Sequence, residues 1–464
     1  MKSITKITVV LASALVMQSC FVAKKYDRPQ VTASDLYRTE TPSTDTTSLA
    51  NLSWDKLFTD PILQGHIKTG IQNNFDMRIA VQTIAAAEAT LKQGKAGYLP
   101  TFALGADWTH QELSKNSQFG SFLPNRSIDQ YQFTGNLSWE ADIWGKIRST
   151  KRSAQAQYFQ SVAARQAIQT QLVSDIASTY FQLMALDAQL RVVDSTLGNR
   201  VKSVDVINSL KEAGETNAVG VKQTEAQLYA TQIIAEDLKN SIVLLENTMS
   251  ILLGESPRKI ERAKFEDQQV APEIKLGVST LLLSKRPDVM AAEFNLVSNF
   301  ELTNVARSNF YPSFTVTGTG GFQSLEIKNW FSASSLFANI VTGLTQPIFN
   351  QRRIRTAYEI AKANQETAFL QFQQAILTAG REVSDALQQY NNEDNKLEIR
   401  IKQLESLRDA ANYSDELLQY GMVNYLEVLT AKDQALNTEL NYIDNQYQKY
   451  NSVIVLYKAL GGGW

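Results

Sequence analysis

The side chains that most often carry chemistry are scarce in this sequence. Its 464 residues include one cysteine, Cys20, and two histidines, His66 and His110. It has no HExxH motif and no cluster of cysteines and histidines, so a catalytic zinc ion would lack ligands. Serine and aspartate are common, but no nucleophile elbow precedes a suitably placed histidine. We therefore expect no catalytic residue, no metal site and no enzyme activity.

The sequence also lacks a phosphate-binding loop and a basic region. The run Gly461-Gly462-Gly463 has no helix after it, so it is not a Walker motif. The 45 Lys and Arg residues are balanced by 47 Asp and Glu residues, which gives no basic surface for nucleic acid. We expect a protein without its own energy source and without a nucleic-acid partner.

Cys20 can undergo a different chemistry, which is acylation. Residues 1–19 have a basic start and an apolar core at 7–17, a length too short for a transmembrane helix and typical of a secretion signal. A lone cysteine after such a signal, preceded by Ser19, resembles the lipobox of bacterial lipoproteins. Phe21 follows it in place of the Asp that retains some lipoproteins in the inner membrane. The alternative is a free thiol at the end of an uncleaved signal anchor.

The remaining chain contains an internal repeat. Residues 98–102 resemble residues 310–314, which follow at an offset of 212, while Gly214 matches Gly421 at an offset of 207. Such matches keep their order along the chain and include the turn residues, which indicates two structural repeats. The predicted segments are a signal peptide (1–19), a lipidated extended segment (20–60), a first repeat (61–272) and a second repeat (273–464).

Four segments alternate between apolar and small polar residues, which predicts β-strands. They cover about residues 101–111, 129–140, 313–324 and 335–346. Strands with one apolar and one polar face suit a membrane barrel with lipid outside and water inside; a pair of soluble hairpins on a core is the alternative. Four strands have open edges, which hydrocarbon does not tolerate, so a membrane sheet of this size requires further copies of the chain.

Long helices are predicted between and after these strand pairs, at about residues 144–256 and 350–461. No proline occurs between Pro124 and Pro257, and none follows Pro347. Apolar residues recur every seven positions, which favours helices packed side by side. Examples are Ile176, Leu183, Leu190, Leu197 and Val204, then Val221, Leu228, Ala235, Ile242 and Met249, and later Leu397, Leu404, Ala411 and Leu418. A soluble coiled-coil scaffold is the alternative.

Several segments, in order along the chain, resemble the TolC-like outer membrane efflux family. The similarity is greatest to its lipoprotein branch, the OprM/NodT type, which serves resistance-nodulation-division pumps. The segments are Trp54–Pro61, Asn73–Arg78, Leu137–Lys146, Lys285–Val289, Tyr420–Leu429 and Tyr457–Trp464. The resemblance implies a mainly α-helical homotrimer. Its long helices would form an α-barrel across the periplasm, and four strands per chain would complete a twelve-stranded β-barrel in the outer membrane.

The same resemblance implies a function. The trimer would be the exit duct of a tripartite efflux system, through which drugs or other small solutes pass passively. Its partners would be a periplasmic adaptor protein, an inner-membrane transporter of the resistance-nodulation-division type and outer-membrane lipid, and the only attached group would be acyl lipid on Cys20. A channel for type I protein secretion and a structural envelope lipoprotein are the alternatives.

The resemblance also places candidate sites in two glycine-containing turns, 213–220 and 420–425, at the periplasmic tip. In the family, two carboxylates after the second turn form a ring that closes the entrance; the matching residues here are Glu427 and Thr430. Glu427 as an ordinary solvated helix residue is the alternative. The candidates for adaptor docking are Lys211, Gly214, Glu215, Thr216 and Asn217 in the first turn and Gln419, Gly421, Met422 and Asn424 in the second.

Overall fold

The computed structural model describes residues 22–29, 53–118, 120–268 and 286–464. The predicted signal peptide and Cys20 lie outside these residues. The chain divides into two compact units, and each unit combines three separate stretches. Unit 1 takes Met1–Gln30, Ile84–Gln160 and Ala292–Phe372, while unit 2 takes Val31–Thr83, Ser161–Ala291 and Gln373–Trp464. The division into two sequential repeats stays a prediction.

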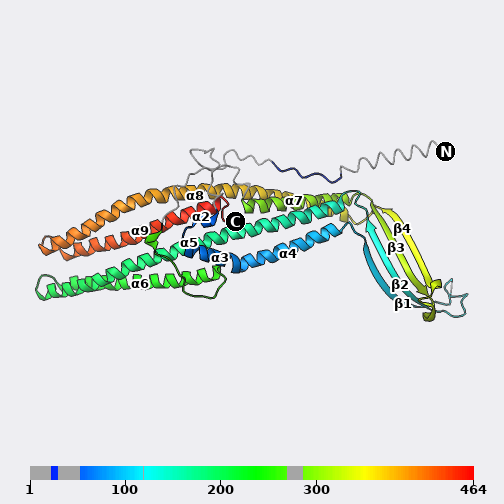
Figure 1. Cartoon of the computed structure of the whole chain (residues 1–464), viewed down its shortest axis with the longest axis horizontal. Coiled ribbons are helices and arrows are strands. Elements are labelled where there is room, and N and C mark those ends of the chain that lie inside the picture. Colours follow the sequence, from blue (N-terminus) through cyan, green and yellow to red (C-terminus); the bar gives the residue numbers. More distant parts are fainter. Residues whose placement is uncertain (1–21, 30–52, 119, 269–285) are drawn as a thin grey trace. The chain divides into compact units, whose positions relative to one another are not determined.

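Most described residues are helical, and four strands form one sheet (Figure 1). In chain order the elements are α2 (Trp54–Leu57), α3 (Pro61–Asn73), α4 (Phe75–Ala96), β1 (Thr101–Glu112), β2 (Ser127–Glu140), α5 (Lys146–Glu212), α6 (Ala218–Leu252), α7 (Pro287–Ser308), β3 (Ser313–Ser324), β4 (Leu336–Thr345), α8 (Arg353–Gln419) and α9 (Tyr425–Ala459). Short 3₁₀ turns occur at η3 (Phe265–Asp267), η5 (Ile327–Asn329) and η6 (Ala333–Ser335).

Corresponding helices in the two halves of the chain have equal lengths. Helices α5 and α8 have 67 residues each, and the return helices α6 and α9 have 35 residues each. Helices α4 and α7 have 22 residues each. Each half therefore contributes a hairpin of one long and one shorter helix, α5–α6 and α8–α9 (Figure 1).

The sheet is antiparallel, with the order β1-β2-β3-β4. Its register aligns Leu104 with Gly135, Gly135 with Gly320, and Gly320 with Ala338. Because side chains alternate across a strand, these residues share one face with most aromatic and aliphatic side chains of the sheet, while Phe337 and Val341 of β4 lie on the opposite face. The opposite face carries mainly Thr, Ser, Asn and Gln. In a single chain the outer edges of β1 and β4 have no strand partner among the described residues.

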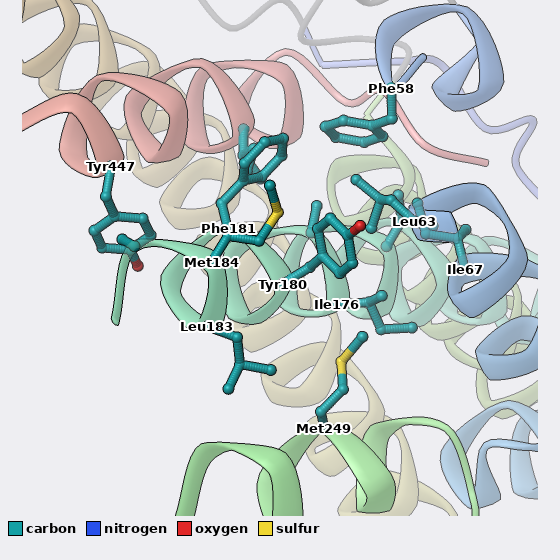
Figure 2. Packing of buried hydrophobic residues seen from close by; sticks show 14 of the residues in the cluster. Phe58, Leu63, Ile67, Ile176, Tyr180, Phe181, Leu183, Met184, Met249 and Tyr447 are labelled. Atoms are coloured by element: carbon teal, nitrogen blue, oxygen red, sulfur yellow. The ribbon is translucent and has the colours of Figure 1, made fainter. Parts of the chain in front are cut away.

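The main hydrophobic core lies in unit 2, where α5 packs against α3, α6 and α9 (Figure 2). Ile176, Tyr180 and Leu183 of α5 are fully buried there, and so are Leu63 of α3 and Met249 of α6. Heptad positions of the sequence thus form the contact between helices, as expected for side-by-side packing.

A polar anchor also lies within this core. The Tyr180 hydroxyl donates to Asp60 Oδ2 at 2.7 Å and accepts from the Ala263 amide at 3.0 Å. Asp60 Oδ1 accepts from the Ile62 amide at the first turn of α3. These bonds join the start of α3, the middle of α5 and the segment after α6.

Each half contains a junction between two helices. The residue just before α4 or α7 forms a hydrogen bond to the last turn of the return helix, α6 or α9. In the Asn74 junction, Asn74 Nδ2 donates to the Leu252 carbonyl at 3.0 Å, while its Oδ1 accepts from the Asp76 and Met77 amides at the start of α4. The side-chain amide therefore caps one helix and binds the last turn of another.

In the Arg286 junction the corresponding bond comes from a guanidinium group. Arg286 Nη1 donates to the Ala459 carbonyl at 2.7 Å, and Nη2 donates to Asp288 at 2.7 Å and to Glu382 at 2.6 Å. Arg286 is only 5% exposed. Two carboxylates offset the cost of burying this cation.

None of the described helices combines the length and the apolarity that crossing a bilayer requires.

Candidate functional site

The first hairpin turn joins α5 to α6 and contains the docking candidates Lys211 to Asn217. Gly214 has φ +78°, and the Glu215 amide donates to the Leu210 carbonyl at 2.9 Å. These features are those of a helix end closed by a left-handed glycine. Asn217 then caps α6 by accepting from the Val219 and Gly220 amides. Lys211, Glu215 and Asn217 are exposed, and Val219 is 62% exposed, so the surface of this turn is mainly polar with one apolar side chain.

The second turn joins α8 to α9 and has the same backbone design. Gly421 has φ +68°, and the Met422 amide donates to the Leu417 carbonyl at 2.9 Å. Its surface differs, because Tyr420 is 77% and Met422 is 72% exposed. Both turns lie at the same end of unit 2 (Figure 1).

Glu427, the gate candidate, exchanges two hydrogen bonds with the side chain of Asn424, the N-cap residue of α9. Its amide donates to Asn424 Oδ1 at 3.1 Å, and its Oε1 accepts from Asn424 Nδ2 at 3.0 Å. The spacing Asn-x-x-Glu is a known sign of a helix start, and it could have been recognised from the sequence. Glu427 is exposed, and Thr430, also exposed, donates to the Leu426 carbonyl at 2.8 Å. Glu427 therefore has a local structural role that any test of gating must separate from its charge.

An ion pair between the two hairpins lies close to the tips. Arg200 of α5 pairs with Asp433 of α9, and both are largely buried, with side-chain exposures of 9% and 23%. Within the second hairpin, Lys432 pairs with Asp415 at 2.7 Å. The Arg200–Asp433 pair is not predictable from the sequence, because the two residues are 233 positions apart and no local pattern connects them.

Residues 22–29, the N-terminal strap, lie along α7 within unit 1. Asn304 holds both main-chain groups of Lys24: its Oδ1 accepts from the Lys24 amide at 3.1 Å, and its Nδ2 donates to the Lys24 carbonyl at 2.9 Å. Further along, Tyr26 packs edge-on against Phe300 at 5.5 Å, and Arg28 pairs with Glu293 at 2.8 Å.

The strap is firmly attached by these contacts. Asn304 is 1% exposed and Val22 is 6% exposed. Burial raises the pKa of Tyr26 to about 12, so its hydroxyl stays neutral. The strap runs from the C-terminal end of α7 toward its N-terminal end, and the C-terminal end of α7 is the one that precedes β3. Its first described residue therefore lies near the root of the sheet.

The family model described as "Outer membrane efflux protein" matches residues 67–255 and 278–462. The chain belongs to the outer membrane efflux protein family. It is therefore an outer membrane protein, in agreement with the expectation from sequence.

Relatives within this family match along almost their whole length. One is described as "Probable outer membrane lipoprotein SilC" of Salmonella typhimurium, 26% identical, with 98% of each chain covered. Another is "Toluene efflux pump outer membrane protein TtgF" of Pseudomonas putida, 26% identical, with 98% of this chain and 96% of the relative covered.

A solved structure of an efflux protein is also similar. It is titled "Crystal structures of CusC review conformational changes accompanying folding and transmembrane channel formation". The TM-score is 0.83 at 25% identity, with 95% of this chain and 99% of that chain covered. The long helices with a four-stranded sheet are thus the fold of a known outer membrane channel.

Proposed function

We propose that three copies of the chain form one continuous duct, as the exit channel of a tripartite efflux system. The observation that carries this proposal is the sheet, which has one mainly apolar and one mainly polar face and is attached to helices of 67 residues. Its two outer edges have no strand partner among the residues that the structure describes. Unpaired strand edges are not tolerated in hydrocarbon, so β4 of one copy pairs with β1 of the next. Three copies supply about twelve strands, a number within the range of membrane barrels.

The helices support the same assembly. Several large apolar side chains on α6 and α8 are more than half exposed in the single chain; they are Tyr229, Ile233, Leu244 and Ile251 on α6 and Ile360, Leu370, Leu377 and Ile399 on α8. Apolar surface of this extent is typical of an interface between chains. We propose that these side chains are covered where copies meet in a closed α-barrel.

The internal duplication is part of this proposal. Helices of equal length occur at fixed offsets, with Gly214 and Gly421 at corresponding turns and positive φ at both. Two such repeats in each of three copies give an approximately sixfold arrangement of helical hairpins, which suits a round barrel.

The hairpin turns are the proposed docking region for a periplasmic adaptor, which connects the duct to an inner-membrane transporter of the resistance-nodulation-division type. The partner transporter must supply the energy, since the sequence has no Walker motif. The protein itself is passive and performs no enzyme reaction.

Glu427 and Thr430 are the proposed gate positions. Three Glu427 carboxylates around the axis would attract cations and repel anions. Glu427→Gln tests this better than Glu427→Ala, because glutamine keeps an oxygen for the Asn424 bond. We expect higher single-channel conductance and lower cation selectivity in planar bilayers; an unchanged conductance and selectivity would count against the gate.

Cys20 is the proposed site of acylation. The strap supports it, since Val22, two positions after Cys20, is fixed by α7 near the root of the sheet. An acyl chain on Cys20 would then enter the membrane beside the barrel. Mass spectrometry of the mature N-terminus tests this: acylated Cys20 is expected, and an unmodified residue there would exclude it.

Drugs or other small solutes are the proposed cargo. The relative TtgF is named for toluene efflux, and the equally similar relative CusC is named for cation efflux, so the relatives' names do not separate the two classes of cargo. The seven Met and two His residues here are few and scattered, which gives no support to soft-metal handling. Single-channel current from the purified protein is the decisive test. A structural envelope lipoprotein would give no current, and a type I secretion channel would depend on a protein substrate.

A further inference from the structure

Helices α5 and α7 pack side by side within unit 1. The hydroxyl oxygens of Ser153 and Ser298 lie 2.9 Å apart, and Gln157 also donates to Ser298 at 3.2 Å. The rings of Phe159 and Phe294 have centroids 5.4 Å apart. Because the residue numbers rise along α5 while they fall along α7, the two helices are antiparallel. The contact of Ser153 with Ser298 fixes their register.

The residues that continue this contact have the spacing of a coiled-coil seam. On both helices they recur at alternating intervals of four and three positions. The α5 positions are Ser149, Ser153, Ala156, Gln160 and Ala163, and the α7 positions are Pro287, Ala291, Phe294, Ser298 and Glu301. None of these residues is exposed, and Ser153 and Ser298 are only 3% and 2% exposed. We call this contact the intrachain seam.

Each position of the intrachain seam has a counterpart in the other half of the chain. Helix α5 begins at Lys146 and α8 at Arg353, an offset of 207, while α4 begins at Phe75 and α7 at Pro287, an offset of 212. The counterparts are Thr356, Ile360, Ala363, Thr367 and Leu370, the α8 stripe, and Phe75, Ile79, Gln82, Ala86 and Ala89, the α4 stripe. All of them are exposed in the single chain. Positions that are covered on α5 and α7 are therefore uncovered on α8 and α4.

We propose that the α8 stripe of one copy packs against the α4 stripe of the next copy, in the register of the intrachain seam. Ile360 then lies opposite Ala86, and Thr367 lies opposite Ile79. The inference rests on the proposed assembly of several copies. It adds which two helix faces meet and which residues face one another.

The side chains support this register independently of the offsets from which it comes. Each isoleucine meets a smaller residue, Ile360 on Ala86 and Ile79 on Thr367, as close packing of two helices requires. At one end of the stripes Leu370 meets Phe75, and both are more than half exposed in the single chain. The seam between copies is thus more apolar than the intrachain seam, where two serines face each other. Burial of apolar surface favours association of separate copies.

Disulfide cross-linking of the full-length protein in membranes tests the register. The test pair is Ile360→Cys with Ala86→Cys, and the control pair is Ile360→Cys with Glu88→Cys. Glu88 is also exposed, but two positions along a helix it points away from the α4 stripe. Since opposed cysteines can reach disulfide geometry, we expect roughly tenfold more covalent dimer and trimer from the test pair on non-reducing gels. The single variants control for bonds to Cys20.

A second test overfills the proposed seam. Ala86→Phe adds a large side chain where Ile360 of the next copy would lie, so we expect most of the trimer to be lost in native mass spectrometry. Glu88→Phe adds the same side chain outside the stripe and should leave the trimer intact. Circular dichroism of both variants separates lost assembly from lost folding.

Equal cross-linking by the test and control pairs would overturn the proposal, and so would an undiminished trimer in Ala86→Phe. A trimer of the unaltered protein together with no cross-link in the test pair would reject this register and leave the proposed duct standing. An unaltered protein that stayed monomeric in the membrane would reject both the duct and the seam between copies.

Discussion

The Asn74 junction and the Arg286 junction perform the same task with different chemistry. Each fixes the last turn of a return helix, at Leu252 in one and Ala459 in the other, to the start of a 22-residue helix. The first uses a neutral amide, and the second uses a buried cation with two carboxylates. The hairpin turns differ in a similar way, since their backbones agree while one surface is mainly polar and the other more apolar. Backbone geometry is therefore the same in the two halves, whereas side chains differ where they meet different neighbours.

The largest expected effect is at the charged junction. Arg286→Leu removes the bond to the Ala459 carbonyl and leaves Glu382 and Asp288 without their cation. We expect the free energy of unfolding to fall by about 3 kcal/mol. This is at the lower end for a broken buried ion pair, because both carboxylates keep access to water. Thermal unfolding followed by circular dichroism measures it. If Arg286→Leu lowered the free energy of unfolding less than Asn74→Ala does, the charges would contribute little to stability.

The neutral junction should be less sensitive. Asn74→Ala removes the cap of α4 and the bond to the Leu252 carbonyl. Together these changes should lower the free energy of unfolding by about 1–2 kcal/mol. Hydrogen exchange of the last turn of α6 should increase, while the last turn of α9 serves as the internal control. Equal exchange at both helix ends would contradict a local role.

The two turns should respond alike. At Gly214 and Gly421 a Cβ would meet nothing within 4 Å, so Gly→Ala acts through conformation alone. We expect each substitution to lower the free energy of unfolding by roughly 1 kcal/mol, because both glycines have positive φ. Gly198→Ala, within α5 and equally uncrowded, is the control and should stabilise the helix by about 0.5–1 kcal/mol. Unequal losses at Gly214 and Gly421 would show that the turns are not equivalent.

The smallest change in stability is expected for a substitution at Arg352, the residue just before α8. Arg352 has φ +64°, whereas Gly145, the corresponding residue before α5, has φ +80°. Arg352→Gly relieves the strained backbone but loses an exposed ion pair with Glu359. Because such pairs are weak, we expect a net gain of up to about 0.5 kcal/mol. A decrease in the melting temperature would mean that the pair matters more than the strain.

The sequence predicted regular elements better than the contacts between them. Alternating residues lie in the four strands, and heptad residues such as Ile176 and Leu183 are buried between helices. Both patterns are local, so a short stretch of sequence contains them. The Arg200–Asp433 pair, the Asn304 bonds to Lys24 and the packing of α5 against α7 depend on residues far apart in the chain. The gate and docking residues stay predictions, since their role depends on other copies and partners.

The strap has a consequence for the order of events during biogenesis. Lys24 and Asn304 are 280 positions apart. The strap therefore cannot bind until α7, which is synthesised much later, is present. Contacts of such high sequence separation form slowly in a free chain. A chain already tethered by a lipid at Cys20 would search for α7 along the membrane surface and not through the whole periplasm. The strap would then bind last, after the part of the chain that contains α7 has folded.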